Sequence, residues 1–146
     1  MSLTAVAHSI PGSLRQEIVI DGRHHLVTDE PEAVGGDGIA PAPHELLPAA
    51  LAGCISTMLV MYARTKEWDL GDVLVDVDFD NKAAPPRFDV RITLTGDLTS
   101  EQLARLEKVA ATCPVRRSIE AGVEFVERIE ARPDSGVSAR LASATG

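Results

Sequence analysis

The sequence has no excess of basic residues and only two cysteines, and these two shortages limit what the protein can do. Its 146 residues contain 14 Lys+Arg against 22 Asp+Glu, which gives a formal net charge of −8. Without a basic excess the chain lacks the means to neutralise rows of phosphate groups. We therefore expect neither nucleic acid nor an anionic membrane surface as a partner.

The two cysteines, Cys54 and Cys113, are too few for a disulfide scaffold, and reducing conditions would keep both as thiols. Residues 1–14 also lack the charged segment and apolar run of a secretory signal. These shortages favour an acidic, soluble, cytoplasmic protein. If the two cysteines pair, we expect the pairing to belong to a reaction cycle.

The length of the chain fits a single domain over residues 1–146 that buries a core without disulfide or metal staples. We expect the core within residues 15–130. Residues 131–146 lack any apolar pattern, so we expect them to form a disordered tail.

The most apolar segment runs from residue 43 to residue 66 and has no charged residue between Glu45 and Arg64. The uncharged run is long enough to be a transmembrane candidate. Its many small residues and the absence of a flanking Lys/Arg cluster favour instead a helix in the core of a globule or a dimer. Because Pro48 donates no backbone hydrogen bond and its ring clashes with the preceding turn, we expect a kink there or an offset first turn.

Patterns on either side of this helix predict antiparallel strands and shorter helices. Asp21-Gly22 suits the tight turn of a β-hairpin between residues 15–20 and 23–28. The proline- and glycine-rich residues 29–42 predict a long loop, and long ordered loops often serve a site. Alternating apolar and polar residues predict two further strands whose apolar faces cover the central helix. These two strands are expected over 73–80 and 88–95. After them we expect a helix over 100–112 capped by Thr99 and Gln102, a helical turn through Glu120, a stop at Gly122 and a last strand over 123–130.

Cys54 lies within the most apolar element and is the leading candidate for a nucleophile. The alternative is a small buried thiol that only fills the core, which is a common fate of cysteine. An attacking thiol must be a thiolate, which a nearby cation, a helix N-terminus or a hydrogen-bond donor would favour. Cys54 lies six residues beyond Pro48, and the effect of the helix dipole fades within the first turn. We therefore expect an arginine to stabilise the thiolate.

Cys113 precedes Pro114, which places it at a break between two elements. It is either a harmless helix end or a resolving thiol on a movable turn. If Pro114 opens the next short helix, Cys113 takes the N-cap position. The spacing of the two cysteines in the sequence neither proves nor excludes a disulfide.

Glu45 stands nine residues before Cys54. On one unbroken helix the two would lie roughly 13 Å apart along the axis and on opposite faces. Contact between them requires the break at Pro48 or a second chain. The alternative role for Glu45 is that of an ordinary anion at the start of the helix. The histidines show no metal-ligand spacing with the cysteines.

These features resemble the OsmC/Ohr family of thiol-dependent peroxidases, and more closely its OsmC-like branch. The resemblance covers residues 15–130. It rests on the combination of a Glu-Leu-Leu segment, an alanine-rich cysteine helix and a distant Cys-Pro-Val. The segments that carry it are Asp29-Glu30-Pro31, Gly35-Gly36, Pro43-His44-Glu45-Leu46-Leu47, Ala49-Ala50-Leu51-Ala52-Gly53-Cys54 and Cys113-Pro114-Val115.

The resemblance implies an α+β fold in which antiparallel sheets pack on a central buried helix and two chains intertwine as a homodimer. It implies that Cys54 attacks an organic hydroperoxide and becomes a sulfenic acid, that Cys113 condenses with it to a disulfide, and that a dithiol reduces this disulfide. Glu45 is the candidate carboxylate, and no metal or other cofactor is implied. The alternative is a non-catalytic module of the same fold that binds a small apolar or electrophilic ligand at the dimer interface.

The sequence departs from the characterised peroxidases at two places. Their catalytic glutamate stands ten residues before the first cysteine, where this chain has His44, and Glu45 matches the neighbouring position. The OsmC-like branch also tends to fill that neighbouring position with Glu. The family draws its catalytic arginine from the N-terminal strands, and here Arg15 and Arg23 are both candidates.

Overall fold

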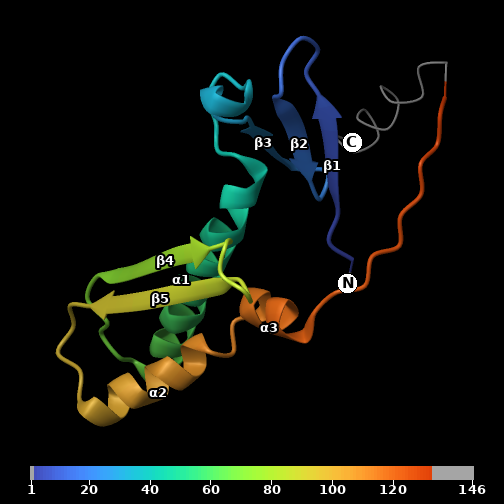
Figure 1. Cartoon of the computed structure of the whole chain (residues 1–146). Helices are drawn as coiled ribbons and strands as arrows, with labels where there is room; N and C mark the ends of the chain where they lie inside the picture. The colour runs from blue at the N-terminus through green and yellow to red at the C-terminus, as the bar shows by residue number, and fades with distance from the viewer. Residues whose placement is uncertain (1, 133–146) are drawn as a thin grey trace. The chain divides into compact units, whose positions relative to one another are not determined.

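The computed structural model describes residues 2–132, which divide into two compact units. The first unit comprises the chain up to Leu46 together with the stretch from Val126, and the second runs from Leu47 to Phe125. The expected disordered tail falls mostly on residues 133–146, which lie outside the described residues. In chain order the elements are β1 (Ala5–Ser9), β2 (Gln16–Ile20), β3 (His24–Thr28), the short 3-10 helices η1 (Glu32–Val34) and η2 (Pro43–Glu45), α1 (Leu46–Lys66), β4 (Val73–Asp80), β5 (Arg87–Leu94), α2 (Ser100–Ala110) and α3 (Pro114–Ala121) (Figure 1).

The first unit is built on a three-stranded antiparallel sheet in the order β1-β2-β3. The predicted hairpin is confirmed, because β2 pairs with β3 through a turn in which Asp21 and Gly22 have φ angles of 54° and 65°. Positive φ at both central positions is what the type I′ turn requires. β1 lies at the sheet edge and pairs only with β2 among the described strands.

The second unit is organised around α1, and of the two predicted arrangements, a kink at Pro48 or an offset first turn, the structure shows the offset turn. The 3-10 turn η2 ends at Glu45, and α1 begins at Leu46. Pro48 therefore falls in the first turn of α1, where a backbone N–H would have no partner within the helix. The sequence thus places its proline where a helix tolerates it.

One stripe of α1 is buried in the core of the second unit. Leu51, Ile55, Leu59 and Ala63 recur every four residues and are at most 3% exposed. By length and composition the helix from residue 43 to residue 66 could cross a membrane, with a mean hydropathy of 1.8. A helix in the core of a protein meets the same criterion of length and composition, and the buried stripe of α1 packs as in a core helix.

The antiparallel pair β4–β5 and the helix α2 cover this stripe. As predicted, β4 alternates between half-buried and exposed residues along its whole length. Thr99 and Gln102 form the predicted capping box, with Gln102 N–H donating to Thr99 Oγ1 over 3.1 Å. The buried core and the residues that pack against it come from all these elements: Leu51, Ile55, Leu59, Ala63, Leu70, Leu106, Val109, Ala110 and Cys113, with Val75, Val77, Phe88, Ile92 and Leu94 from the strands.

The predicted last strand over residues 123–130 is wrong for the single chain. α3 ends as predicted before Gly122, whose φ is 74°, but the residues from 122 to 132 form no strand. Their large apolar side chains are exposed, including Phe125 at 78% and Val126 at 82%. A strand needs a neighbouring strand for its N–H and C=O groups, and none of the strands in residues 2–132 takes that place.

Candidate active site

The structure brings the two cysteines together in the second unit. Cys54 comes from the middle of α1, and Cys113 precedes α3 as its N-cap residue. Both are free thiols, and the side chain of Cys113 is a hydrogen-bond partner of the Cys54 thiol. Cys113 is fully buried, whereas Cys54 is only half-buried. In such a pair, a reagent from solvent can reach the half-buried sulfur of Cys54, whereas the sulfur of Cys113 is accessible only from Cys54.

The surroundings of Cys54 favour the protonated thiol over the thiolate. Burial raises its pKa most, and the hydrogen bond and charge of Cys113 raise it further. The backbone N–H of Val115 donates to the Cys54 sulfur and lowers the pKa, but the net shift is upward. Of the described groups that act on Cys54, only this N–H stabilises the thiolate.

The hydrogen bond from Val115 arises from the way α3 begins. Proline at the first helical position fixes the backbone, and the next N–H has no partner within the helix. Cys113 occupies the N-cap as predicted, but its side chain makes no capping hydrogen bond. The unpaired donor of α3 is therefore used by the sulfur of Cys54.

These contacts predict the pH dependence of Cys54 reactivity. Because only the thiolate is alkylated, the pH midpoint of Cys54 alkylation by iodoacetamide reports its pKa, which burial and the contact with Cys113 raise. Removing Cys113 in Cys113→Ala lowers the pKa of Cys54, so the midpoint moves to lower pH. Peptide mass spectrometry of samples labelled from about pH 6 to about pH 10 measures both midpoints. A midpoint in Cys113→Ala that equals or exceeds that of the wild-type thiol contradicts this prediction.

A cavity of about 570 Å³ lies beside the cysteine helix within the second unit. Its walls are mostly apolar side chains of α1, β5 and α2, and neither cysteine lines it. Two charged residues, Glu107 and Arg116, also contribute to the lining. The cavity has the size of a site for a small molecule, and its lining combines apolar side chains with polar groups.

Glu45 and the two candidate arginines belong to the first unit. Glu45 ends η2, and its Oε2 accepts a hydrogen bond of 2.8 Å from the N–H of Ala42. This capping contact is the structural alternative that the sequence left open, and it leaves the rest of the carboxylate available. Among residues 2–132 no group of three or more His, Cys, Asp or Glu side chains could hold a metal ion.

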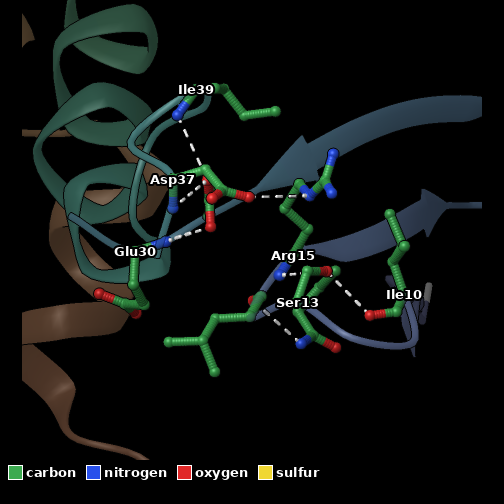
Figure 2. Close-up of polar contacts among 9 residues, drawn as sticks. Ile10, Ser13, Arg15, Glu30, Asp37 and Ile39 are labelled. Carbon is green, nitrogen blue, oxygen red and sulfur yellow. Dashed lines mark hydrogen bonds and ion pairs between the residues drawn. The ribbon is translucent and has the colours of Figure 1, made fainter. Parts of the chain in front are cut away.

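The two arginines differ in their surroundings. Arg23 is 71% exposed and pairs with Asp21 in the hairpin turn, over 3.4 Å. Arg15 is 34% exposed, and its Nε lies 3.8 Å from Asp37 Oδ2, beyond hydrogen-bonding distance (Figure 2). The Nε of Arg15 is buried and has no hydrogen-bond partner. Arg15 is thus the arginine with an unused donor.

Sequence reasoning missed Asp29 and the N–H of Val115. Asp29 was seen only as part of a motif, although it is 1% exposed and charged groups are rarely buried without partners. A signal was present, because an Asp at the end of a strand and before a Gly-rich loop is well placed to bind backbone N–H groups. The role of Val115 depends on tertiary packing that no local pattern reports.

The fold and the two adjacent thiols define an α+β protein with a two-cysteine site between its central helix and the start of α3. The family model for OsmC, described as OsmC-like protein, matches residues 35–128, and the chain belongs to this family. The resemblance seen in the sequence is thereby confirmed, as is the fold class of antiparallel sheets with a central helix.

Several solved structures are similar to this chain. A protein from Psychrobacter arcticus 273-4, described as an osmotic stress induced and detoxification response protein, is 27% identical with a TM-score of 0.63, over 80% of this chain and 87% of its own. The organic hydroperoxide resistance protein OsmC of Legionella pneumophila is 25% identical with a TM-score of 0.57, over 82% and 89%. OhrB of Bacillus subtilis, at 21% identity and a TM-score of 0.51 over 80% and 89%, shares the fold. None of the curated proteins matches the chain at a significant level.

Proposed function

We propose that the protein reduces organic hydroperoxides by a two-cysteine mechanism. The Cys54 thiolate attacks the outer peroxide oxygen, the O–O bond breaks, and the departing alkoxide takes a proton to leave as an alcohol. The resulting sulfenic acid condenses with the Cys113 thiol to a disulfide and releases water. An external dithiol then reduces the disulfide by two exchange steps, which regenerates both thiols.

The observation that carries this proposal is the contact between the two thiols, because a resolving cysteine must reach the sulfenic acid without a large movement. The similarity to an organic hydroperoxide resistance protein of Legionella pneumophila supports the substrate class. Exposure also fits the two roles, since the attacking sulfur is half-buried and the resolving one is buried. Because the cycle ends in reduction to thiols, we propose the reducing cytoplasm as its compartment.

The reaction needs a cation for the thiolate and for the departing oxygen. Burial raises the pKa of Cys54, so the contacts of the second unit alone leave too little thiolate at neutral pH. We propose Arg15 over Arg23 for this role, because its Nε is buried and donates no hydrogen bond, although it pairs with Asp37 over 3.8 Å. We propose Glu45 as the carboxylate of the reaction, with His44 in the adjacent position.

The direct test supplies the purified protein with tert-butyl hydroperoxide and dithiothreitol and follows the loss of peroxide. Sustained, protein-dependent consumption is the expected result. If the wild-type protein consumes no peroxide with any dithiol, the peroxidase proposal is wrong.

We further propose that the working form is a homodimer. The exposed face of α1 presents the uncharged residues Ala50, Gly53, Thr57 and Met61, and the segment after α3 exposes large apolar side chains without a partner strand. Burying such surface against a second copy is favourable at roughly 25 cal/mol per Å². The exposed apolar residues are Val123, Phe125, Val126 and Ile129.

A charge placed in this segment should weaken the dimer. We expect the wild-type chain to sediment as a dimer and Phe125→Asp to shift the population toward monomer, raising the dissociation constant by about 10-fold or more. Glu124→Gln, at the neighbouring exposed position, is the matched control and should stay dimeric. A wild-type protein that sediments as a monomer at micromolar concentration contradicts the dimer.

A second candidate function rests on the cavity of about 570 Å³ in the second unit. In this alternative the protein binds a small apolar or electrophilic ligand, and Cys54 contributes no chemistry. The apolar side chains of the cavity favour this ligand-binding function, but the function does not explain why the two thiols lie in contact. We therefore rank the peroxidase first.

A further inference from the structure

Asp29 is the most completely bound carboxylate in the described part of the chain. It follows β3 directly and is 1% exposed. Its Oδ1 accepts a hydrogen bond from the N–H of Glu30 over 2.8 Å, and its Oδ2 accepts two more, from Asp37 over 3.1 Å and from Ile39 over 3.2 Å. Figure 2 shows these three residues converging from the loop. Both oxygens of the carboxylate are therefore occupied by backbone donors.

The backbone of Asp29 closes the same loop. Its N–H donates to the carbonyl of Pro41 over 3.1 Å, so one residue ties both the middle and the end of the loop to the end of β3. The loop also passes close to itself, since a Cβ on Gly36 would collide with the backbone of Glu30. The shape of residues 30–41 thus depends on Asp29.

The loop held by Asp29 leads to both polar groups proposed for catalysis. Asp37, whose N–H binds Asp29, carries the carboxylate that faces Arg15 over 3.8 Å (Figure 2). Ala42 follows the anchored Pro41 directly, and its N–H holds the carboxylate of Glu45. The loop contacts that position Arg15 and Glu45 therefore both depend on Asp29.

The charge of Asp29 also acts on Arg15. Burial raises the pKa of Asp29, but the three backbone donors and the nearby Arg15 charge lower it by more, and the net shift is downward. Asp29 is therefore ionised at neutral pH and attracts the guanidinium. The backbone of Arg15 is fixed from the other side, where its N–H donates to Ser13 Oγ.

We infer that Asp29 is a positioning residue for the proposed peroxidase reaction, holding the loop that orients Arg15 and Glu45. It touches no substrate and acts only through these two groups. The inference rests on the proposed function.

Asp29→Asn tests the inference because it keeps the side-chain shape and removes the charge and one acceptor. We expect the rate of Cys54 oxidation by tert-butyl hydroperoxide to fall by about 10- to 100-fold, since small displacements of catalytic groups cost that much. Oxidation of the cysteine pair by diamide also starts from the Cys54 thiolate but has no departing alkoxide to stabilise, so the diamide rate should fall by less than the peroxide rate. Asp21→Asn makes the same change in the hairpin turn of this unit and should leave both rates unchanged.

A combined variant separates positioning from general damage. If Asp29 acts through Arg15 and Glu45, adding Asp29→Asn to a variant that carries both Arg15→Met and Glu45→Gln slows the peroxide reaction by no more than about threefold. A larger additional loss, or a wild-type peroxide rate in Asp29→Asn, overturns the inference. If the wild-type protein itself does not react with peroxide, the proposed function fails, and the inference is overturned with it.

A second variant decides the matter if Asp29→Asn does not fold. Gly38 has a φ of 63° and free space around it, so Gly38→Ala strains the loop without a collision and without touching Asp29. We expect it to slow the peroxide reaction by about three- to tenfold and to slow diamide oxidation by less. Equal rates with wild type in both reactions overturn the inference.

Discussion

We expect Cys54→Ser to abolish peroxide consumption, with a loss of at least about 1,000-fold in rate. A serine hydroxyl is protonated at any working pH and lacks the nucleophilicity of a thiolate, so the first step cannot occur. The substitution is nearly isosteric at a half-buried position, so the fold should survive it. The loss of tert-butyl hydroperoxide, followed with dithiothreitol as reductant, measures the effect.

Ser56→Ala is the matched control, because it changes a half-buried hydroxyl on the same helix two residues away. It should keep wild-type turnover. The same serine variant of Cys54 also separates the two proposed functions. If the protein is a ligand-binding module, an apolar ligand such as n-octanol raises the thermal midpoint equally in wild type and in Cys54→Ser, while neither consumes peroxide.

We expect Cys113→Ser to be over-oxidised by peroxide and then to stall. Cys54 still attacks, but its sulfenic acid finds no resolving thiol and reacts with further peroxide to a sulfinic acid that dithiols do not reduce. The intact mass of the chain should therefore rise by two oxygen atoms. Mass spectrometry after stepwise addition of peroxide, together with turnover under dithiothreitol, measures both effects.

The variant with both cysteines replaced by serine is the control, and its mass should not change. Sustained turnover by Cys113→Ser at the wild-type rate would show that the external dithiol attacks the sulfenic acid directly. In that case the contact between the two sulfurs has no catalytic purpose, and the two-cysteine mechanism is wrong.

Much of the fold could be predicted because local chemistry determines it. Asp21-Gly22 dictates a tight turn, Thr99 and Gln102 dictate a helix start, and alternating residues dictate the half-buried strands of the second unit. Each of these signals acts over a few neighbouring residues, so no tertiary context is needed to see it. The segment 123–130 also has the pattern of a strand, but pairing depends on a neighbour, and none of the strands within residues 2–132 pairs with it.

The candidate site was predicted in its residues but not in its arrangement. Cys54 was singled out because a thiol in the most apolar element is unusual, and Cys113 because a proline follows it. Whether Arg15 or Arg23 has an unused donor depends on the packing of the hairpin and the loop, which no spacing reveals. The roles proposed for Cys54, Cys113 and Glu45 remain predictions for the experiments above.

The sequence by itself indicated the family, the elements from β2 to α3, a disturbed helix start near Pro48 and the break between elements at Cys113. These follow from residue types and short spacings. Only the tertiary structure decided that Cys113 lies against Cys54, that the Val115 N–H points at the sulfur, and that Asp29 gathers the loop around its carboxylate. Such contacts join residues distant in the chain, and their geometry is set by how the elements pack rather than by any local preference.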